Sequence, residues 1–204
     1  FRHYGPDGQV IRQAVRTVEA LGVLTETLTT LFNSQTPFSD GFVVADVSGP
    51  GAVGFELIEV GDTLMGLNAV SDSDFTDSYS AQLAHGNGVI FTSLKLVNTT
   101  NATRTVQLTA FLMEPDGSVT NLMEERTLGP FESLQQPVQS VFDLDGSATL
   151  VEGSLRVQCP AGGVIGDVIF GDPNNVKYAA ALALQSAPFR RAIFSQISNA
   201  GDAF

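Results

Sequence analysis

The chain has 204 residues with 22 acidic and 10 basic side chains, which give a formal charge of -12 and a pI near 4.3. Nucleic acids and anionic membrane surfaces are bound by clustered Lys and Arg, so this charge argues against both as partners. The single cysteine, Cys159, excludes an intrachain disulfide. No apolar run approaches the roughly 20 residues of a transmembrane helix, so we expect no membrane insertion of this chain.

A sequence repeat of about 110 residues runs through the chain. FRHYGPDGQV from Phe1 matches FLMEPDGSV from Phe111, and the stretch that ends at Phe32 matches the one that ends at Phe142. Two more matches follow in the same order: DGFVVADVSGPGAVGFELIEVGD from Asp40 with EGSLRVQCPAGGVIGDVIFGD from Glu152, and Gln196 to Phe204 with Gln82 to Phe91. We therefore expect a partial first repeat over residues 1–83, a complete second repeat over 84–197, and the start of a further repeat or a tail over 198–204.

The predicted elements, in chain order, are short strands with one helix in each repeat. Apolar residues at three- and four-residue spacing predict helices over Leu24–Phe32 and Glu132–Phe142. Pro137 predicts that the second helix is short, kinked or begins there. Alternating apolar residues predict strands from Ile90 and from Val106, Val119–Leu128, Ser154–Cys159, Val164–Phe170, Lys177–Gln185 and Arg191–Ile197, with a hairpin turn at Glu114-Pro115-Asp116-Gly117.

This order of elements predicts a mainly β fold. Seven or eight antiparallel strands with frequent turns fit a two-sheet sandwich of the immunoglobulin type better than a barrel. Long helices that would cover a parallel α/β sheet are missing from the pattern. We expect two tandem immunoglobulin-like β-sandwich units, each with one short helix, and the first incomplete at its N-terminus.

Several passages resemble a family of poorly characterised repeat modules. These passages are NGVIFTSLKLVNTTNATRTVQLTAFLMEPDGSV, LGPFESL, EGSLRVQCPAGGVIGDVIFGDPN and YAAALALQ. Together they resemble the tandem immunoglobulin-like β-sandwich modules of large bacterial secreted and cell-surface proteins. The resemblance covers most of the chain and implies an extracellular, non-catalytic array whose ligand is unknown. Cys159 and the partial first repeat depart from the family pattern.

Two segments have the residue types of a ligand site. GPGAVG from Gly49 fits the G-x-G-x-x-G pattern of dinucleotide sites, but the FELIEVGD that follows alternates like a strand, which favours a turn between strands. Asp72, Asp74 and Asp77 place three carboxylates in one short segment, which makes them a calcium candidate. A solvated acidic loop is the alternative in so acidic a chain. We expect no cofactor other than this calcium.

The sequence contains few residues or motifs that are typical of catalytic sites. His3 and His85 are the only histidines, and H-E-x-x-H, G-x-S-x-G and P-loop patterns are absent. We expect His85 in a loop between the repeats and Cys159 as a small buried hydrophobe. Asn98 and Asn101 begin glycosylation sequons but are better explained as turn residues.

The leading hypothesis is a non-enzymatic structural, adhesive or spacer module of an exported bacterial protein. Its expected location is extracellular, at the cell surface or periplasmic. Its expected partners are neighbouring repeats and proteins or glycans at the cell surface. The first alternative is a carbohydrate- or calcium-binding accessory module of a larger secreted enzyme. A second alternative is an enzyme with a carboxylate site between the repeats, marked by two facing acids of perturbed pKa.

Overall fold

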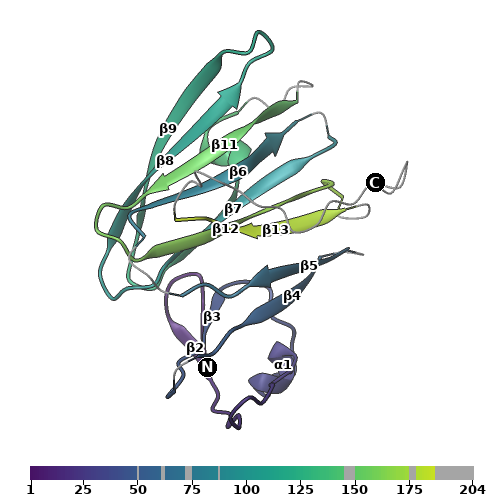
Figure 1. The fold of residues 1–204 in the computed structure, drawn as a ribbon, viewed down its shortest axis with the longest axis vertical. Helices are drawn as coiled ribbons and strands as arrows, with labels where there is room; N and C mark the ends of the chain where they lie inside the picture. The colour runs from purple at the N-terminus through teal and green to yellow at the C-terminus, as the bar shows by residue number, and fades with distance from the viewer. Residues whose placement is uncertain are drawn as a thin grey trace.

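The computed structural model describes residues 1–49, 51–60, 63–71, 75–86, 88–144, 150–174 and 178–186. Within these ranges the chain forms thirteen strands and two one-turn helices. The molecule is therefore mainly β, as expected from the sequence. No helix in the described ranges is long and apolar enough to cross a membrane. The fold has a main part, residues 75–186, and an N-terminal part, residues 1–71, which lie one above the other in Figure 1.

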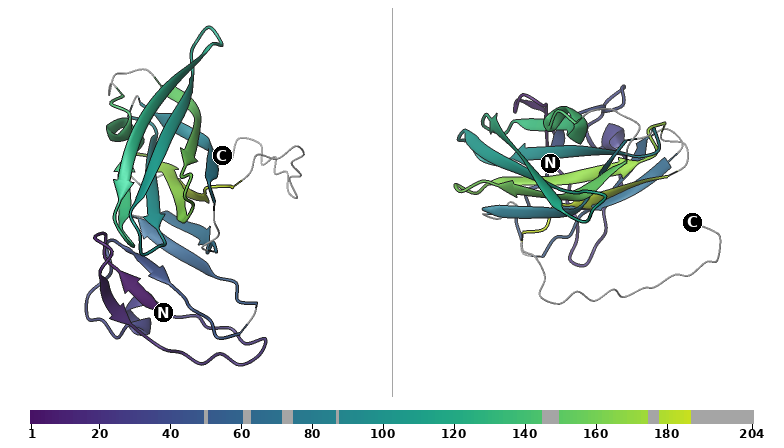
Figure 2. Two further views of the ribbon diagram at one scale, coloured as in Figure 1. Left: turned by 90° about the vertical axis from the view of Figure 1, so that its left-hand side faces the viewer. Right: turned by 90° about the horizontal axis from the view of Figure 1, so that it is seen from above.

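The main part contains two four-stranded antiparallel sheets, an arrangement consistent with a β-sandwich (Figures 1 and 2). One sheet has the order β10-β7-β12-β13 and the other has the order β6-β11-β8-β9. The first is built from β10 (Ser133–Pro137), β7 (Phe91–Asn98), β12 (Val164–Gly171) and β13 (Ala179–Ala183). The second is built from β6 (Asp77–His85), β11 (Val151–Gln158), β8 (Arg104–Met113) and β9 (Val119–Leu128).

The core between these sheets follows from the alternation in the sequence. Leu94 and Leu96 on β7 and Val106 and Leu108 on β8 are at most 1% exposed and belong to one hydrophobic cluster. Each strand directs every second side chain inward, so an alternating run places its apolar side chains in the core and its polar side chains in water. Cys159 is part of the same cluster and is 2% exposed, as expected for a small buried hydrophobe.

The N-terminal part is smaller and contains two sheets. β1 (Arg2–Tyr4) lies between β2 (Val10–Gln13) and β3 (Phe42–Val44), while β4 (Phe55–Val60) and β5 (Thr63–Asn68) pair with each other. β5 contacts β13, so the hairpin lies against the edge of a sheet of the main part (Figure 1). Tyr4 stacks between Phe42 and Phe131, which belongs to the main part. These contacts join the two parts.

The helices differ from their prediction in length. Of the two stretches predicted as helix, only Leu28–Leu31 (α1) and Val138–Val141 (α2) are helical in the described structure. The region from 133 to 137, predicted as helix, is instead strand β10 paired with β7. The physical reason is that Pro137 lacks an N–H and cannot continue a helix from the residues before it, whereas it is accepted at the cap of α2, where the structure places it. Pairing with β7 satisfies the preceding backbone.

The two parts share local geometry at the spacing of the sequence repeat. Leu21 and Phe131 both have positive φ, of 62° and 55°, and so do Asn33 and Asp143, at 48° and 50°. Helices α1 and α2 begin 110 positions apart, at residues 28 and 138. The sheet order β2-β1-β3 matches β9-β8-β11, because each hairpin turns through a Pro-Asp-Gly segment and then pairs with the strand after the helix.

The sheets divide the chain at a different position from the sequence repeat. The expected boundary between residues 83 and 84 falls inside β6, which pairs with β11 of the main part on both sides of a register shift. The strand predicted over Lys177–Gln185 is β13, although residues 175–177 lie outside the described ranges. The strand predicted over Arg191–Ile197 lies outside them as well, as does the expected tail over 198–204.

Candidate functional site

The calcium candidate lies mostly outside the described residues. Asp72 and Asp74 fall in the gap at residues 72–74, while Asp77 begins β6. The Asp77 carboxylate accepts from Arg156 on β11, with 2.8 Å between Arg156 Nε and Asp77 Oδ1. Its negative charge is thus paired with a guanidinium in this structure. Over the ranges that the structure describes, no group of three or more His, Cys, Asp or Glu residues could hold a metal ion.

The glycine-rich segment from Gly49 leads into a strand. Residues 51–54 have no regular structure, and β4 begins at Phe55. Binding of a pyrophosphate in the dinucleotide motif requires a helix that begins at the glycines, whereas in the described part of this segment the glycines are followed by a strand. The interpretation as a connection between strands agrees with the structure, since the segment lies between β3 and β4.

The two histidines lie in different surroundings. His3 is 4% exposed on β1, and its ring contacts those of Phe32 and Phe38. His85 was expected in a loop, but it is the last residue of β6 and pairs with Val151. A strand position follows because β6 continues to this residue beside β11. Among the described residues, neither histidine has a hydrogen-bonded carboxylate, the partner that orients the base of a catalytic triad.

Cys159 and Asn98 have structural surroundings. Burial raises the pKa of the Cys159 thiol, and its Sγ donates to Gly162 O at 3.3 Å. Asn98 is fully buried, and its Nδ2 donates to the carbonyls of Ala102 and Gly129, both at 2.7 Å. A buried amide with these contacts confirms the turn role and is inaccessible to a glycosyl group.

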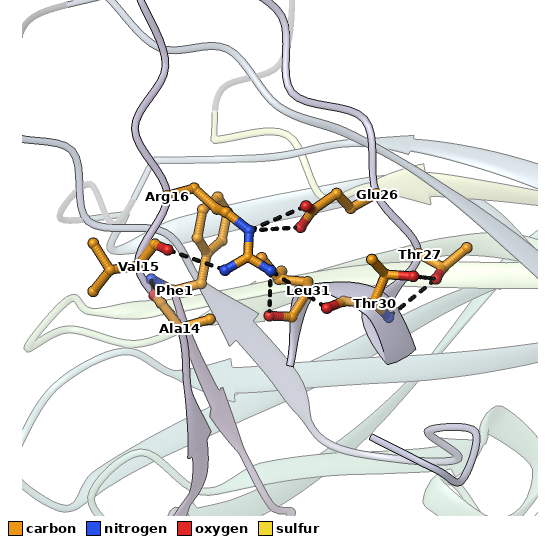
Figure 3. Close-up of polar contacts among 8 residues, drawn as sticks. All are labelled: Phe1, Ala14, Val15, Arg16, Glu26, Thr27, Thr30 and Leu31. Atoms are coloured by element: carbon orange, nitrogen blue, oxygen red, sulfur yellow. Dashed lines mark hydrogen bonds and ion pairs between the residues drawn. The ribbon is translucent and has the colours of Figure 1, made fainter. Parts of the chain in front are cut away.

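Arg16 organises the most connected polar cluster of the N-terminal part (Figure 3). Its Nη2 donates to the carbonyl of Leu31 at 2.9 Å, at the end of α1, and its Nε donates to the Glu26 carboxylate at 3.0 Å. Arg126 repeats this contact 110 positions later, with 3.0 Å between its Nη2 and Val141 O at the end of α2. Each arginine thus satisfies a terminal carbonyl that a one-turn helix leaves free.

A carboxylate of perturbed pKa lies where the two parts meet. Asp167 on β12 is half-buried and directly opposite Lys95 on β7. Burial raises the pKa of Asp167 from its usual value of 3.8 to about 6, the Lys95 charge lowers it, and the Glu56 charge raises it again. Lys95 Nζ also donates to Gly41 O at 2.6 Å, which connects the main part to the segment before β3. Sequence reasoning missed this group, because its members are far apart in the chain.

Two cavities of the described surface lie away from Asp167. The larger, of about 390 Å³, lies over β6, β8 and β11 and is lined by main-chain and apolar groups such as Leu83, Phe111 and Gly153. The second, of about 300 Å³, is lined by residues that include Phe1, Arg2 and Asp46. Asp167 is not among the residues that line either of these two cavities.

The edge of β3 is the feature of the N-terminal part that differs most from the main part. β11 is paired on both sides, with β8 and β6, whereas β3 is paired in the described structure only with β1. Val43 shares a face with buried His3, its register partner, yet it is 37% exposed. The apolar side chain of Val43 is thus only partly covered in the described structure.

Comparisons with known proteins give little further information. No family model matches the chain, and no curated protein matches it. A solved structure titled "Crystal Structure of Thermotoga maritima 1070" is similar over 53% of this chain and 89% of its own, with 15% identity and a TM-score of 0.41. A likeness of this size supports no conclusion about fold or function.

Proposed function

We propose that this chain is a non-enzymatic structural module of an exported bacterial protein, with a spacer or adhesive role. In this proposal the main part is one complete immunoglobulin-like unit and the N-terminal part is an incomplete unit of the same kind. The proposal includes an extracellular, cell-surface or periplasmic location. Its contacts are with neighbouring repeats and with proteins or glycans at that surface.

The supporting observation is that the repeated contacts are those that build the fold. Arg16 and Arg126 bind the ends of equivalent helices at a constant spacing. Asp167, the acid with the raised pKa, is not repeated, because the residue 110 positions earlier is Leu57. The contacts that build the fold are thus repeated, and the acid of raised pKa is not. This pattern is typical of an array of modules, in which each unit serves as a building block.

Exposed apolar side chains of the N-terminal part support the adhesive role. Phe55, Leu57 and Leu64 lie on one face of the β4–β5 hairpin and are 62–63% exposed. Contiguous exposed apolar side chains of this kind mark interaction surfaces more often than monomer surfaces. Together with the edge of β3 that is unpaired in the described structure, they give this half of the molecule two places for contact with another protein.

The test separates this proposal from its two alternatives. Esters, glycosides and peptides are offered to the 204-residue chain and to Asp167→Asn, and we expect no turnover by either. Turnover that Asp167→Asn abolishes while the far-ultraviolet circular dichroism stays unchanged would establish an enzyme instead.

Glycan arrays and melting curves, each with calcium and with EDTA, address the accessory-module alternative. We expect no retained glycan and equal melting temperatures. A calcium-dependent rise that Asp77→Asn removes and Arg156→Gln retains would favour the calcium-binding module. Arg156→Gln is the matched control because it breaks the same ion pair and leaves the carboxylate in place.

A further inference from the structure

One turn of the main part holds the end of a hairpin of the N-terminal part. In this turn, residues 129–132, the ring of Phe131 stacks on that of Tyr4, with 5.2 Å between the ring centroids. Ser133 N, directly after the turn, donates to Pro6 O at 2.9 Å. Pro6 belongs to the turn between β1 and β2. We call residues 129–132 the docking turn and the turn that it holds the hairpin tip.

The N-terminal part has a docking turn of its own, at residues 19–22. A hydrogen bond from the amide of the fourth residue to the carbonyl of the first closes it at 2.8 Å, as the same bond closes residues 129–132 at 3.1 Å. Leu21 lies at the position of Phe131 and shares its positive φ, which is uncommon outside glycine. The Leu21 side chain is fully exposed, whereas Phe131 contacts Tyr4.

The main part likewise has a hairpin tip of its own, at residues 114–117. This tip and residues 5–8 both contain Pro-Asp-Gly, and in each the same two backbone hydrogen bonds measure 2.9–3.0 Å. A Cβ on Gly8 would overlap Pro130 O of the docking turn, whereas a Cβ on Gly117 would meet no heavy atom of the described structure within 4 Å. The tip of the N-terminal part is therefore docked, and the tip of the main part is open.

Apolar side chains lie beside the open tip. Met113 directly precedes it, as Tyr4 precedes the docked tip, and Met113 is 65% exposed. Together with Phe111 and Val119 it lines the cavity of about 390 Å³ over β6, β8 and β11. Met113 thus offers an apolar side chain where Tyr4 offers its ring to Phe131, and the flexible thioether adapts to partners of different shape.

The open tip and the exposed docking turn lie at opposite ends of the molecule. Figure 1 shows the turn between β8 and β9 at one end of the long axis and the segment between β2 and α1 at the other. A second copy displaced along this axis brings its docking turn toward the open tip of the first. The contact that joins the two parts of one chain can therefore continue from one molecule to the next.

We propose that the docking turn at residues 19–22 of one molecule binds the hairpin tip at residues 114–117 of a second molecule, with Leu21 on Met113. This inference rests on the proposed structural role and names the partner, a second copy of the chain. The two surfaces differ, so the contact is heterologous and links molecules head to tail into open chains. Two molecules of charge -12 repel each other, so association should strengthen in about 0.5 M NaCl, where screening acts within about 4 Å.

Two substitutions block the two surfaces separately. Leu21→Asn removes the apolar side chain and keeps the turn, because Asn tolerates positive φ. Gly117→Asn keeps the tip for the same reason and adds a side chain where the docked Gly8 has none. The association constant, measured by sedimentation in about 0.5 M NaCl, should fall at least about tenfold in each variant. An equimolar mixture should form dimers that do not grow longer, since each variant keeps the surface that the other lacks.

The controls make the same changes elsewhere on the surface. Val53→Asn alters an exposed valine, and Gly88→Asn alters a glycine of positive φ with open space around it, so both should associate like the wild type. Met113→Lys blocks the tip by a second route and should weaken association, whereas Met123→Lys on β9 should not. Melting temperatures equal to that of the wild type verify that each variant is folded.

Three results would overturn the inference. They are a wild type that remains monomeric up to about 1 mM in about 0.5 M NaCl, association that the blocking variants leave unchanged, and folded blocking variants whose mixture stays monomeric. Head-to-tail association does not depend on the absence of turnover or glycan binding, so its failure leaves the proposed function standing, and the reverse also holds.

Discussion

Replacement of Asp167 by Asn should make the protein more stable at neutral pH. The carboxyl group is half-buried on β12, opposite Lys95, and burial is the largest cause of its raised pKa. Asn keeps the shape and the hydrogen-bonding capacity of the protonated acid and never carries its charge. The substitution therefore removes the cost of holding a carboxylate at the junction.

The size of the effect follows from the two pKa values. The unfolded chain releases the Asp167 proton near its usual pKa of 3.8, and the folded protein releases it near a pKa of about 6. Between these values the folded state binds more protons than the unfolded state, so the contribution of Asp167 to stability falls as the pH rises. The full shift corresponds to about 3 kcal/mol, and solvent screening of a half-buried group reduces this to about 1–3 kcal/mol. The contribution is intact below pH 4 and lost above pH 6.

Urea unfolding of the wild type and Asp167→Asn from pH 4 to pH 8 measures the difference directly. The free energies of unfolding of the two proteins should agree near pH 4, and that of Asp167→Asn should be higher by about 1–3 kcal/mol at pH 7. Asp116→Asn is a control of opposite sign, because Ser118 lowers the pKa of Asp116 by hydrogen bonding. A difference between the wild type and Asp167→Asn that is constant with pH, or that grows toward acid, would refute the reasoning.

Two further substitutions test the packing of the main part, each by urea unfolding. Gly153→Ala should lower the free energy of unfolding by more than about 2 kcal/mol, because an added Cβ would overlap the carbonyl oxygen of Phe111 on the neighbouring strand. Gly49→Ala, with open space around the residue, should change it by less than about 0.5 kcal/mol. Asn98→Ala should cost about 2–3 kcal/mol, because two carbonyls lose their donor in a buried turn, and exposed Asn121→Ala should be nearly neutral. Equal costs within either pair would contradict the corresponding contact.

The strands of the main part could be predicted because apolar and polar residues alternate along them. Val106 and Leu108 are apolar at every second position, and the structure buries both. The turn at Glu114 to Gly117 could also be predicted from its Pro-Asp-Gly residues, and Gly117 has the positive φ, 82°, that such a turn needs. These signals are local, so no knowledge of distant residues was required.

The strand before α2 could not be predicted from its own residues. Leu134, Val138 and Val141 have the spacing of a helix, yet the backbone around Leu134 pairs with β7, whose Leu96 lies some 40 residues earlier. A short segment with mixed periodicity adopts the structure that its neighbours can satisfy. For the same reason the boundary of the main part differs from that of the sequence repeat, since β6 finds its partner on β11.

The sequence by itself determined that this chain is acidic, mainly β and repeated, because composition, alternation and self-similarity are properties of the residues in order. The tertiary structure decided which strands became neighbours. It placed Asp167 beside Lys95 and within the field of Glu56, and it left one edge of β3 uncovered in the described structure. Both features depend on groups brought together over long distances along the chain, where burial and Coulomb interactions act through space.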